Sequence, residues 1–430
     1  MSGEVVSLAE GPAAAPVIGL TAASTRRATA IMIAVRTGYA YNWYTVGPVL
    51  PAIGAQFSVG PADWGFLLAI FLVAAGLLQV PAGMLAQRYG SRAVALSGAA
   101  LLGAASIASG FAPTFASLVV LRGLAGVGAA LFFSPAIGLI GSLYPEGKRG
   151  LPVGIFSSAF SGGAAAGVLF SAIAVGPLGW RWTLALGGIG LLALTVGAVR
   201  LIPRNAGRPL PTPVPRPKLP AALRLPALWA IGFAFIGLEG ATFATGQFLV
   251  PYGTLELGWG AAVAGAVGMA FLLPSVVGGP IGGYITERRS DRRTQFSVAG
   301  GLAAVTVSLI PWVGLVPMVF LGIVFSFAYG ATYAVMYVLP NYLPGLPAGE
   351  IPVGIGLFNS IQLAGGAVVA WAFGLWVASL GYSLAWSLLA LVVVVPLALL
   401  VYVPRTGLGG PAAARRPDVA AAVPRPEPAR

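Results

Sequence analysis

The chain has 430 residues, of which 58% are hydrophobic and 8% charged, and a mean hydropathy of +0.90, so the lipid bilayer rather than water is expected to be its main solvent. The net charge of +13 would suggest a nucleic-acid partner in a soluble protein, but the basic residues lie between apolar segments, so none is expected. Because cysteine and histidine are absent, there is no thiolate or imidazole for a metal site or a catalytic pair, and we expect no metal, no cofactor and no enzyme.

Twelve apolar stretches are bounded by charge, proline or glycine, and each is close to the roughly 20 residues that cross a bilayer. They lie near 29–54, 64–86, 93–112, 115–143, 151–176, 180–201, 225–251, 261–285, 294–312, 316–341, 351–378 and 382–403. None shows the period-2 alternation of a barrel strand, so each is predicted to be a helix. The predicted fold class is therefore an all-α membrane protein with twelve transmembrane helices.

The distribution of Lys and Arg predicts the orientation. Of the 24 basic residues, 21 fall on one side of the predicted spans, and the exceptions are Arg36, Arg122 and Arg181. Cytoplasmic loops accumulate Lys and Arg, so we expect a multi-pass protein of the cytoplasmic (inner) membrane with both termini cytoplasmic. Residues 1–27 lack the pattern of a signal peptide and are predicted to be a cytoplasmic tail, and residues 404–430 a disordered one.

Residues 203–224 are rich in proline and arginine and cannot form a span. This segment is interpreted as a semi-rigid linker between two halves, and a strip that binds a partner or anionic lipid is the alternative. Comparison of the chain with itself at an offset of 200 supports two halves: residues 151–155 match residues 351–355, and Pro51 falls on Pro251. We therefore expect two pseudo-symmetric six-helix bundles, residues 28–202 and 225–403.

The loop after the second span repeats in the second half. The first copy contains Gly83, Arg88, Gly90 and Arg92, and the second contains Gly283, Glu287, Arg288, Asp291 and Arg292. Both resemble the loop signature G-x-L-x-D-R-x-G-R-R of the major facilitator superfamily, although Gln87 stands where the signature has aspartate. The fourth span, from Arg122 to Ala130, is similar to the family pattern R-x-x-x-G-x-G-A. The resemblance implies two bundles around a midplane cavity that opens alternately to each side, with the paired loops as gating loops.

Polar and aromatic residues inside the spans are candidates for a substrate site. Arg36, Tyr39 and Trp43 share one helical face, with Asn42 beside them. The further candidates are Arg122, Gln247, Tyr329, Tyr333, Tyr337, Asn359 and Gln362. A buried arginine must face the bundle interior or water, and a guanidinium grips a carboxylate through two hydrogen bonds. We expect these side chains to line one central, water-filled site that binds a small molecule.

Glu239 is the carboxylate placed deep within a predicted span. Burial favours the neutral form of a carboxyl group and a nearby cation favours the ionised form, so substrate or conformation could switch its protonation. Two interpretations remain open: a proton carrier, or a static ion pair with Arg36 or Arg122 that only orders the bundle.

These features predict a monomeric secondary transporter that moves a small organic solute by alternating access and together with protons, as a symporter. An organic anion is the candidate solute. The alternatives are an uncoupled uniporter, an efflux antiporter, or a membrane solute sensor that retains the fold. The expected partners are the substrate, protons and the lipid bilayer.

Overall fold

The computed structural model describes residues 21–145, 148–207, 223–288, 291–339, 343, 346 and 351–403. Within these ranges the side chains of residues 150, 287, 334, 337, 338 and 351–353 are not described. Most of the predicted N-terminal tail and linker, and all of the predicted tail 404–430, therefore lie outside the described residues.

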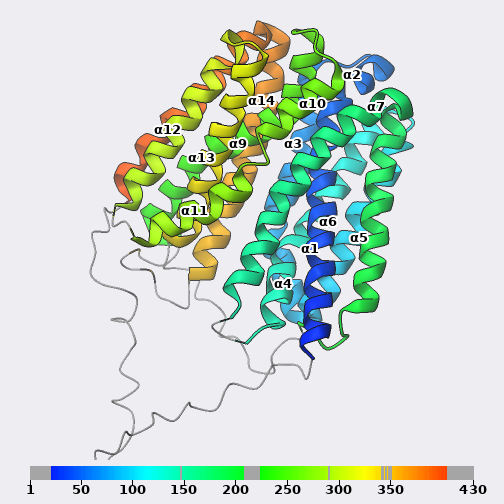
Figure 1. Cartoon of the computed structure of the whole chain (residues 1–430), viewed down its shortest axis with the longest axis vertical. Coiled ribbons are helices and arrows are strands. Elements are labelled where there is room, and N and C mark those ends of the chain that lie inside the picture. Colours follow the sequence, from blue (N-terminus) through cyan, green and yellow to red (C-terminus); the bar gives the residue numbers. More distant parts are fainter. Residues whose placement is uncertain are drawn as a thin grey trace, which may run out of the picture.

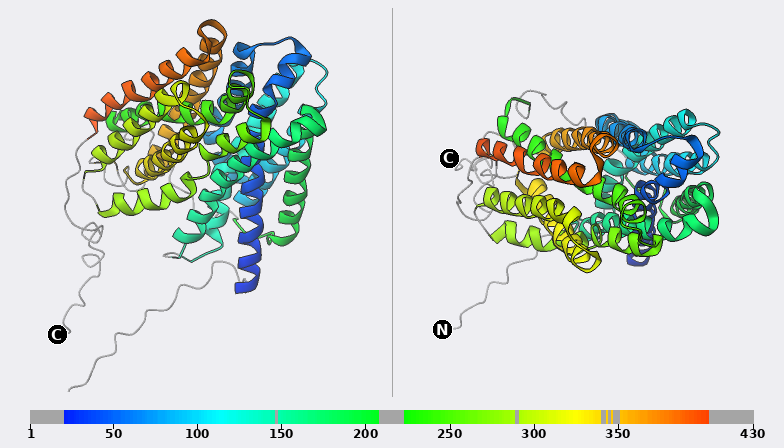
Figure 2. Two further views of the ribbon diagram at one scale, coloured as in Figure 1. Left: turned by 45° about the horizontal axis from the view of Figure 1, so that its top comes forward. Right: turned by 90° about the horizontal axis from the view of Figure 1, so that it is seen from above.

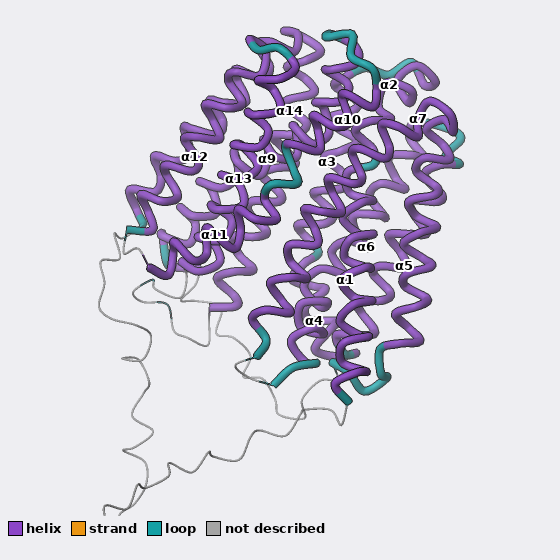
Figure 3. The backbone as a smooth tube through the Cα atoms, in the orientation of Figure 1, coloured by secondary structure: helices purple, strands orange, loops and turns teal. Residues whose placement is uncertain are grey.

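The described residues form helices joined by short loops, and they contain no strand (Figure 3). The N-terminal half comprises α1 (Ala22–Tyr44), α2 (Val46–Phe57), α3 (Pro61–Leu77), α4 (Gln79–Tyr89), α5 (Ser91–Gly110), α6 (Phe115–Ser142) and α7 (Gly150–Leu201). The C-terminal half comprises α9 (Pro226–Leu255), α10 (Ala261–Ala270), α11 (Ser275–Arg288), α12 (Arg292–Leu309), η1 (Ile310–Trp312), α13 (Leu315–Val338), α14 (Ile351–Val394) and η4 (Val395–Tyr402). The all-α prediction is confirmed.

Eight described helical stretches are long and apolar enough to cross a membrane, and the bent pair α3 and α4 makes nine. Two of the eight contain 51 and 49 residues, about twice the length that a bilayer requires. Each of these two turns at a glycine, so each holds two of the predicted spans. α1 is not among the eight, since Arg26, Arg27 and Arg36 lower its hydropathy. The count of twelve therefore stays a prediction. Most helix bounds follow the predicted ones within a few residues, but α1 begins at Ala22, well before the predicted residue 29.

Gly179 and Gly381 make the two sharp turns. Their φ angles are 71° and 78°, a left-handed region that side chains with a β-carbon rarely adopt. After the first turn, the Arg181 guanidinium donates to the carbonyl oxygens of Gly110 and Ala112, both at 3.1 Å. These carbonyls lie at the C-terminal end of α5 and have no partner within that helix. Arg181 is one of the three basic residues that do not lie on the predicted cytoplasmic side of the spans, and the structure explains its position: it caps a neighbouring helix.

The two halves lie side by side, with the blue-to-green helices of the N-terminal half on one side and the green-to-orange helices of the C-terminal half on the other (Figures 1 and 2). α1 begins and α4 ends at the lower end in Figure 1, which we call the basic end because Arg88, Arg200 and Arg224 lie there. α2, α3, α10 and α14 come together towards the opposite end (Figure 1).

Small residues let the helices approach closely. A β-carbon at Gly167 in α7 would lie 2.6 Å from the carbonyl oxygen of Tyr41 in α1, so only glycine permits this approach. Large apolar side chains such as Val120 and Phe320 are exposed on the outside of the assembly. This arrangement suits lipid, where van der Waals packing rather than exclusion of water holds helices together.

Candidate functional site

The two halves meet through neutral side chains at mid-depth and towards the end opposite the basic end. Gln247 Nε2 of α9 donates to the Trp43 carbonyl oxygen at 2.8 Å. Ser275 Oγ and Ser161 Oγ lie 2.7 Å apart, which joins the start of α11 to α7. Asn359 Nδ2 of α14 donates to Gln79 Oε1 of α4 at 2.6 Å. Glycines also allow the halves to touch: a β-carbon at Gly47 would lie 2.5 Å from the Gln247 carbonyl oxygen. We call this region of contact between the halves, from mid-depth to the end opposite the basic end, the closed zone.

Arg36 lies in a cage of aromatic rings in the N-terminal half. Its guanidinium carbon is 4.7–5.5 Å from the ring centres of Phe133, Phe156 and Phe160, and 4.9 Å from that of Tyr39. The side chain is 5% exposed. Rings at this distance attract a cation through their quadrupole, and the attraction strengthens when water is excluded. The cage holds a positive charge at mid-depth on rings from α1, α6 and α7.

Arg122 is a second buried cation, 1% exposed on α6. Its guanidinium carbon lies 4.5 Å from the ring centre of Phe71, which packs edge-on against Trp43 at 4.8 Å. Arg122 forms no ion pair with any described residue, and its buried Nε has no hydrogen-bond partner among them. A buried guanidinium donor with no acceptor is costly, so this position favours an anion nearby.

Glu239 is 9% exposed on α9 in the C-terminal half. The hydroxyl of Tyr329 on α13 donates to its Oε2 at 2.9 Å. Gly366 of α14 packs on the other side, since a β-carbon there would lie 3.2 Å from the Glu239 Cγ. Glu239 forms no ion pair with any described residue, so the structure does not contain the predicted static pair with Arg36 or Arg122.

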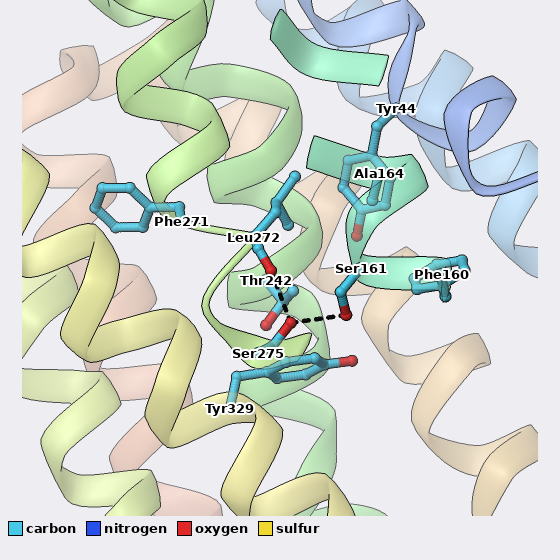
Figure 4. A pocket seen from close by; sticks show the side chains of 9 residues that line it. All are labelled: Tyr44, Phe160, Ser161, Ala164, Thr242, Phe271, Leu272, Ser275 and Tyr329. Carbon is cyan, nitrogen blue, oxygen red and sulfur yellow. Dashed lines mark hydrogen bonds between the residues drawn. The ribbon is translucent and has the colours of Figure 1, made fainter. Parts of the chain in front are cut away.

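A small cavity lies where the two halves meet (Figure 4). It is lined from the N-terminal half by Tyr44, Phe160, Ser161 and Ala164, and from the C-terminal half by Thr242, Phe271, Leu272, Ser275 and Tyr329. The centre of a water molecule can occupy about 10 Å³ of it, which is room for about one water. Phe160 separates the cavity from Arg36, and Tyr329 connects it to Glu239. Arg36 of the N-terminal half therefore contacts one aromatic residue of the cavity lining, Phe160, and Glu239 of the C-terminal half contacts another, Tyr329.

The structure brings several of the predicted site residues to this region. The rings of Tyr39 and Trp43 are tilted against each other with centres 5.5 Å apart, and the Trp43 ring centre lies 6.5 Å from that of Phe243 in the other half. The rings of Tyr333 and Tyr329 are also tilted, with centres 5.7 Å apart. Asn359 accepts from Gln362 Nε2 at 2.7 Å, as well as contacting Gln79.

Of the predicted site residues, one lies away from the cavity and one has a side chain that is not described. Asn42 donates to the carbonyl oxygens of Gly38 and Gly187, at 2.8 and 2.9 Å, so it joins α1 to α7 inside the N-terminal half. The Tyr337 side chain lies outside the described residues.

The predicted gating-loop residues lie at the basic end. Arg92 donates to the carbonyl oxygens of Val199 and Ile202, at 2.7 and 3.1 Å, and so caps the end of α7. Gly90 has a φ of 91° at the junction of α4 and α5. Arg88 lies over the ring of the exposed Tyr89, and a β-carbon at Gly83 would meet open space.

In the second copy, Asp291 caps α12 by accepting from the Thr294 backbone N–H at 3.0 Å. Arg288 lies over the Tyr284 ring at 4.2 Å. Arg292 is buried and Gly283 is half-buried on α11, while the Glu287 side chain lies outside the described residues.

Sequence reasoning missed the hydroxyl groups around the cavity. Thr242 is three residues after Glu239, so helical periodicity places both on one face, and this signal could have found it. Ser161 and Ser275 meet only because α7 and α11 pack together, and nothing in the sequence indicates that pairing. Among the described residues there is no group of three His, Cys, Asp or Glu that could hold a metal ion.

Comparison with known proteins gives the following matches. The model of the Major Facilitator Superfamily matches residues 32–370. A protein of Mycobacterium tuberculosis named probable nitrate/nitrite transporter NarK2 is 29% identical over 269 residues, which are 61% of this chain and 67% of that protein. The 4-hydroxybenzoate transporter PcaK of Pseudomonas putida is 28% identical over 161 residues, 37% of this chain and 36% of PcaK. Puromycin resistance protein pur8 of Streptomyces alboniger is 32% identical over 162 residues, 37% of this chain and 32% of pur8.

Solved structures share the fold. A D-xylose-proton symporter superposes with a TM-score of 0.72 at 15% identity, over 89% of this chain and 98% of that one. A POT family transporter in complex with 5-aminolevulinic acid superposes with a TM-score of 0.69 at 15% identity, over 87% and 95% of the two chains. At these identities the likeness concerns the fold alone.

Proposed function

Since this chain belongs to the Major Facilitator Superfamily, a family of membrane transporters rather than enzymes, we propose that it moves a small organic anion across the cytoplasmic membrane together with protons. The observation that supports this is the set of charged groups that are buried in the two halves around the cavity. Arg36 and Arg122 are buried in the N-terminal half, Glu239 is buried in the C-terminal half, and Glu239 is paired with neither. An anion is the ligand that the buried Arg122 guanidinium favours, because its Nε has no acceptor among the described residues.

Proton coupling follows from repulsion between like charges. An anion at the cavity would lie roughly one side chain, on the order of 8 Å, from Glu239, and at an effective dielectric constant of about 20 the repulsion between two unit charges is about 2 kcal/mol. Ionised Glu239 would therefore weaken anion binding about 30-fold, and protonation would remove this penalty. By linkage, the bound anion favours protonated Glu239 by the same factor. Anion and proton would then move together, as in a symporter.

The same proposal includes an arrangement in the membrane. We propose that the basic end faces the cytoplasm, because 21 of the 24 Lys and Arg lie on that side of the spans, and that both termini are cytoplasmic. Residues 28–202 and 225–403 would then rock against each other about the cavity, with residues 203–224 as the linker. Both walls of the cavity come from one chain, so a monomer suffices.

The choice of substrate follows the named relatives. NarK2 is named for nitrate and nitrite and PcaK for 4-hydroxybenzoate, all of which are small anions. The aromatic lining of the Arg36 cage favours a planar organic anion, because rings stack on rings and on guanidinium groups. We therefore choose 4-hydroxybenzoate as the first probe and nitrate as the second.

The test uses the full chain in proteoliposomes with an imposed pH gradient. Glu239→Gln is expected to abolish accumulation of the probe against its gradient and to leave exchange of labelled for unlabelled probe intact. Glu256→Gln is the matched control, since Glu256 is an exposed carboxylate at the end of the same helix and should leave both activities unchanged. Accumulation by Glu239→Gln at the level of the unmodified chain would refute the coupling role.

Efflux antiport is the second candidate, favoured by the resistance protein pur8 among the relatives. The direction of proton movement separates the two functions. When the probe is added to vesicles, a symporter makes the outer solution more alkaline, whereas an antiporter makes it more acidic. A uniporter or a sensor leaves the external pH unchanged.

A further inference from the structure

A second groove lies away from the central cavity, on the outer surface at the basic end. It is formed by the start of α9 and the end of η4, and has a volume of about 410 Å³. The residues that line it are Leu223, Arg224, Pro226, Trp229, Ala230, Phe233, Leu399 and Tyr402. η4, the red-orange end of the described chain, lies at the outer edge of the helix assembly (Figure 2). This groove therefore faces the surroundings of the protein rather than the interface between the halves.

The wall of the groove is aromatic and ordered. Trp229 and Phe233 are one helical turn apart on α9, and their rings stack with centres 6.1 Å apart and an interplanar angle of 25°. Trp229 Nε1 donates to the Leu223 carbonyl oxygen at 2.9 Å, so the indole is fixed by the segment that enters the helix. Both rings remain about two-fifths exposed, at 37% and 43%. In a membrane protein such an exposed apolar wall lies against acyl chains.

A positive charge lies at this groove. Arg224 is exposed and is the charged residue among those that line the groove. Tyr402 and Trp229 add the aromatic side chains that favour the boundary between headgroups and acyl chains. A rim formed by Arg224, above an apolar aromatic wall, matches a ligand with a negative head and an apolar tail.

We propose that this groove binds one anionic phospholipid, whose phosphate lies at Arg224 and whose acyl chain lies along Trp229, Phe233 and Leu399. A volume of about 410 Å³ is within the range of small-ligand sites and accommodates part of one lipid. A soluble phosphate compound uses only the rim, whereas a phospholipid uses both the rim and the wall. A lipid bound here would contact both α9, the first helix of the C-terminal half, and η4, its last helix.

The test measures lipid binding to the purified full chain by native mass spectrometry, with phosphatidylglycerol as the probe and phosphatidylcholine as the neutral comparison. Arg224→Gln is expected to lower the affinity for phosphatidylglycerol about fivefold, equivalent to about 1 kcal/mol for one basic residue beside an anionic headgroup. Arg26→Gln is the matched control, because Arg26 is an exposed arginine at the basic end of the other half, and it should change nothing. Phe233→Ala should weaken binding of both lipids.

Each alternative outcome overturns the proposal. An equal loss for Arg224→Gln and Arg26→Gln would mean that a diffuse positive field, not this groove, holds the lipid. Equal binding of phosphatidylglycerol and phosphatidylcholine would remove the role of the charge. Displacement of phosphatidylglycerol by soluble glycerol phosphate at equal concentration would identify a free phosphate ligand instead. Melting temperatures of the variants show whether each one has folded, and Phe233→Ala keeps the apolar wall testable if Arg224→Gln fails to fold.

Discussion

Replacing Gly374 by alanine is expected to weaken the contact that closes the protein at the end opposite the basic end. A β-carbon at Gly374 of α14 would collide with the Pro61 carbonyl oxygen and lie 2.9 Å from the Cα of Gly65, both in α3. These contacts involve backbone atoms, which cannot rotate away, so the helices must separate. Overpacking of this kind costs about 1–3 kcal/mol, which corresponds to a roughly 5- to 150-fold increase in the population in which α3 and α14 are apart.

Cysteine labelling measures this population without interference, because the chain has no cysteine of its own. Ala172→Cys places a thiol in the closed zone: Ala172 is fully buried, and its Cβ lies 2.7 Å from the position of a β-carbon at Gly265 of α10. Adding Gly374→Ala to this reporter should raise its rate of reaction with a polar maleimide by the same factor. Gly176→Ala is the control, since a β-carbon there meets no atom within 4 Å. An unchanged rate in a folded Gly374→Ala protein would refute the inference that this packing closes the end.

Three further substitutions test individual contacts. Arg92→Gln removes two charge-assisted hydrogen bonds to the end of α7 and should lower the free energy of unfolding by about 2–3 kcal/mol in thermal melts, whereas the exposed Arg88→Gln should have little effect. Asn42→Leu removes the two side-chain hydrogen bonds that Asn42 donates, each with a net contribution of about 0.5–1.5 kcal/mol, so we expect a loss of about 1–3 kcal/mol in the same melts and no specific loss of probe affinity. Tyr329→Phe removes the hydrogen bond to Glu239, so probe accumulation should change its dependence on pH while melting changes little; an unchanged pH profile would contradict the proposed link.

The helices could be predicted from the sequence because the bilayer sets their length and charged or proline residues mark their ends. The expected stretch 93–112 corresponds to α5 at Ser91–Gly110, and the expected break between 176 and 180 corresponds to the turn at Gly179. The breaks within spans were not predicted. α1 and α2 separate at Thr45 and α3 bends at Leu78. In each case a proline follows three residues later, Pro48 and Pro81, and it lacks the backbone N–H that would continue the helix.

The candidate site could be predicted only in part. Burial of Arg36, Arg122 and Glu239 follows from their position in apolar helices, since a charge in the hydrocarbon region must turn inward. The side chains that contact these three residues cannot be predicted from the sequence. Aromatic rings surround Arg36 and a tyrosine hydroxyl meets Glu239, and both results depend on which helices become neighbours. Asn42 shows the same limit: its helical face is clear from the sequence, but the helix it bonds to is not.

The separation of charged and neutral contacts bears on how the two halves could move. Among the residues that the structure describes, the hydrogen bonds between the halves, such as Gln247 to Trp43 and Ser275 to Ser161, join neutral groups. Each neutral bond contributes a net of about 0.5–1.5 kcal/mol, whereas breaking a buried ion pair between the halves would leave two unpaired charges at a cost of about 3–5 kcal/mol. A contact made of neutral bonds and glycines can therefore open for a few kcal/mol, the size of difference that lets two conformations exchange. In the proposed cycle the charges would then respond to substrate and protons, while the neutral contacts would open and close.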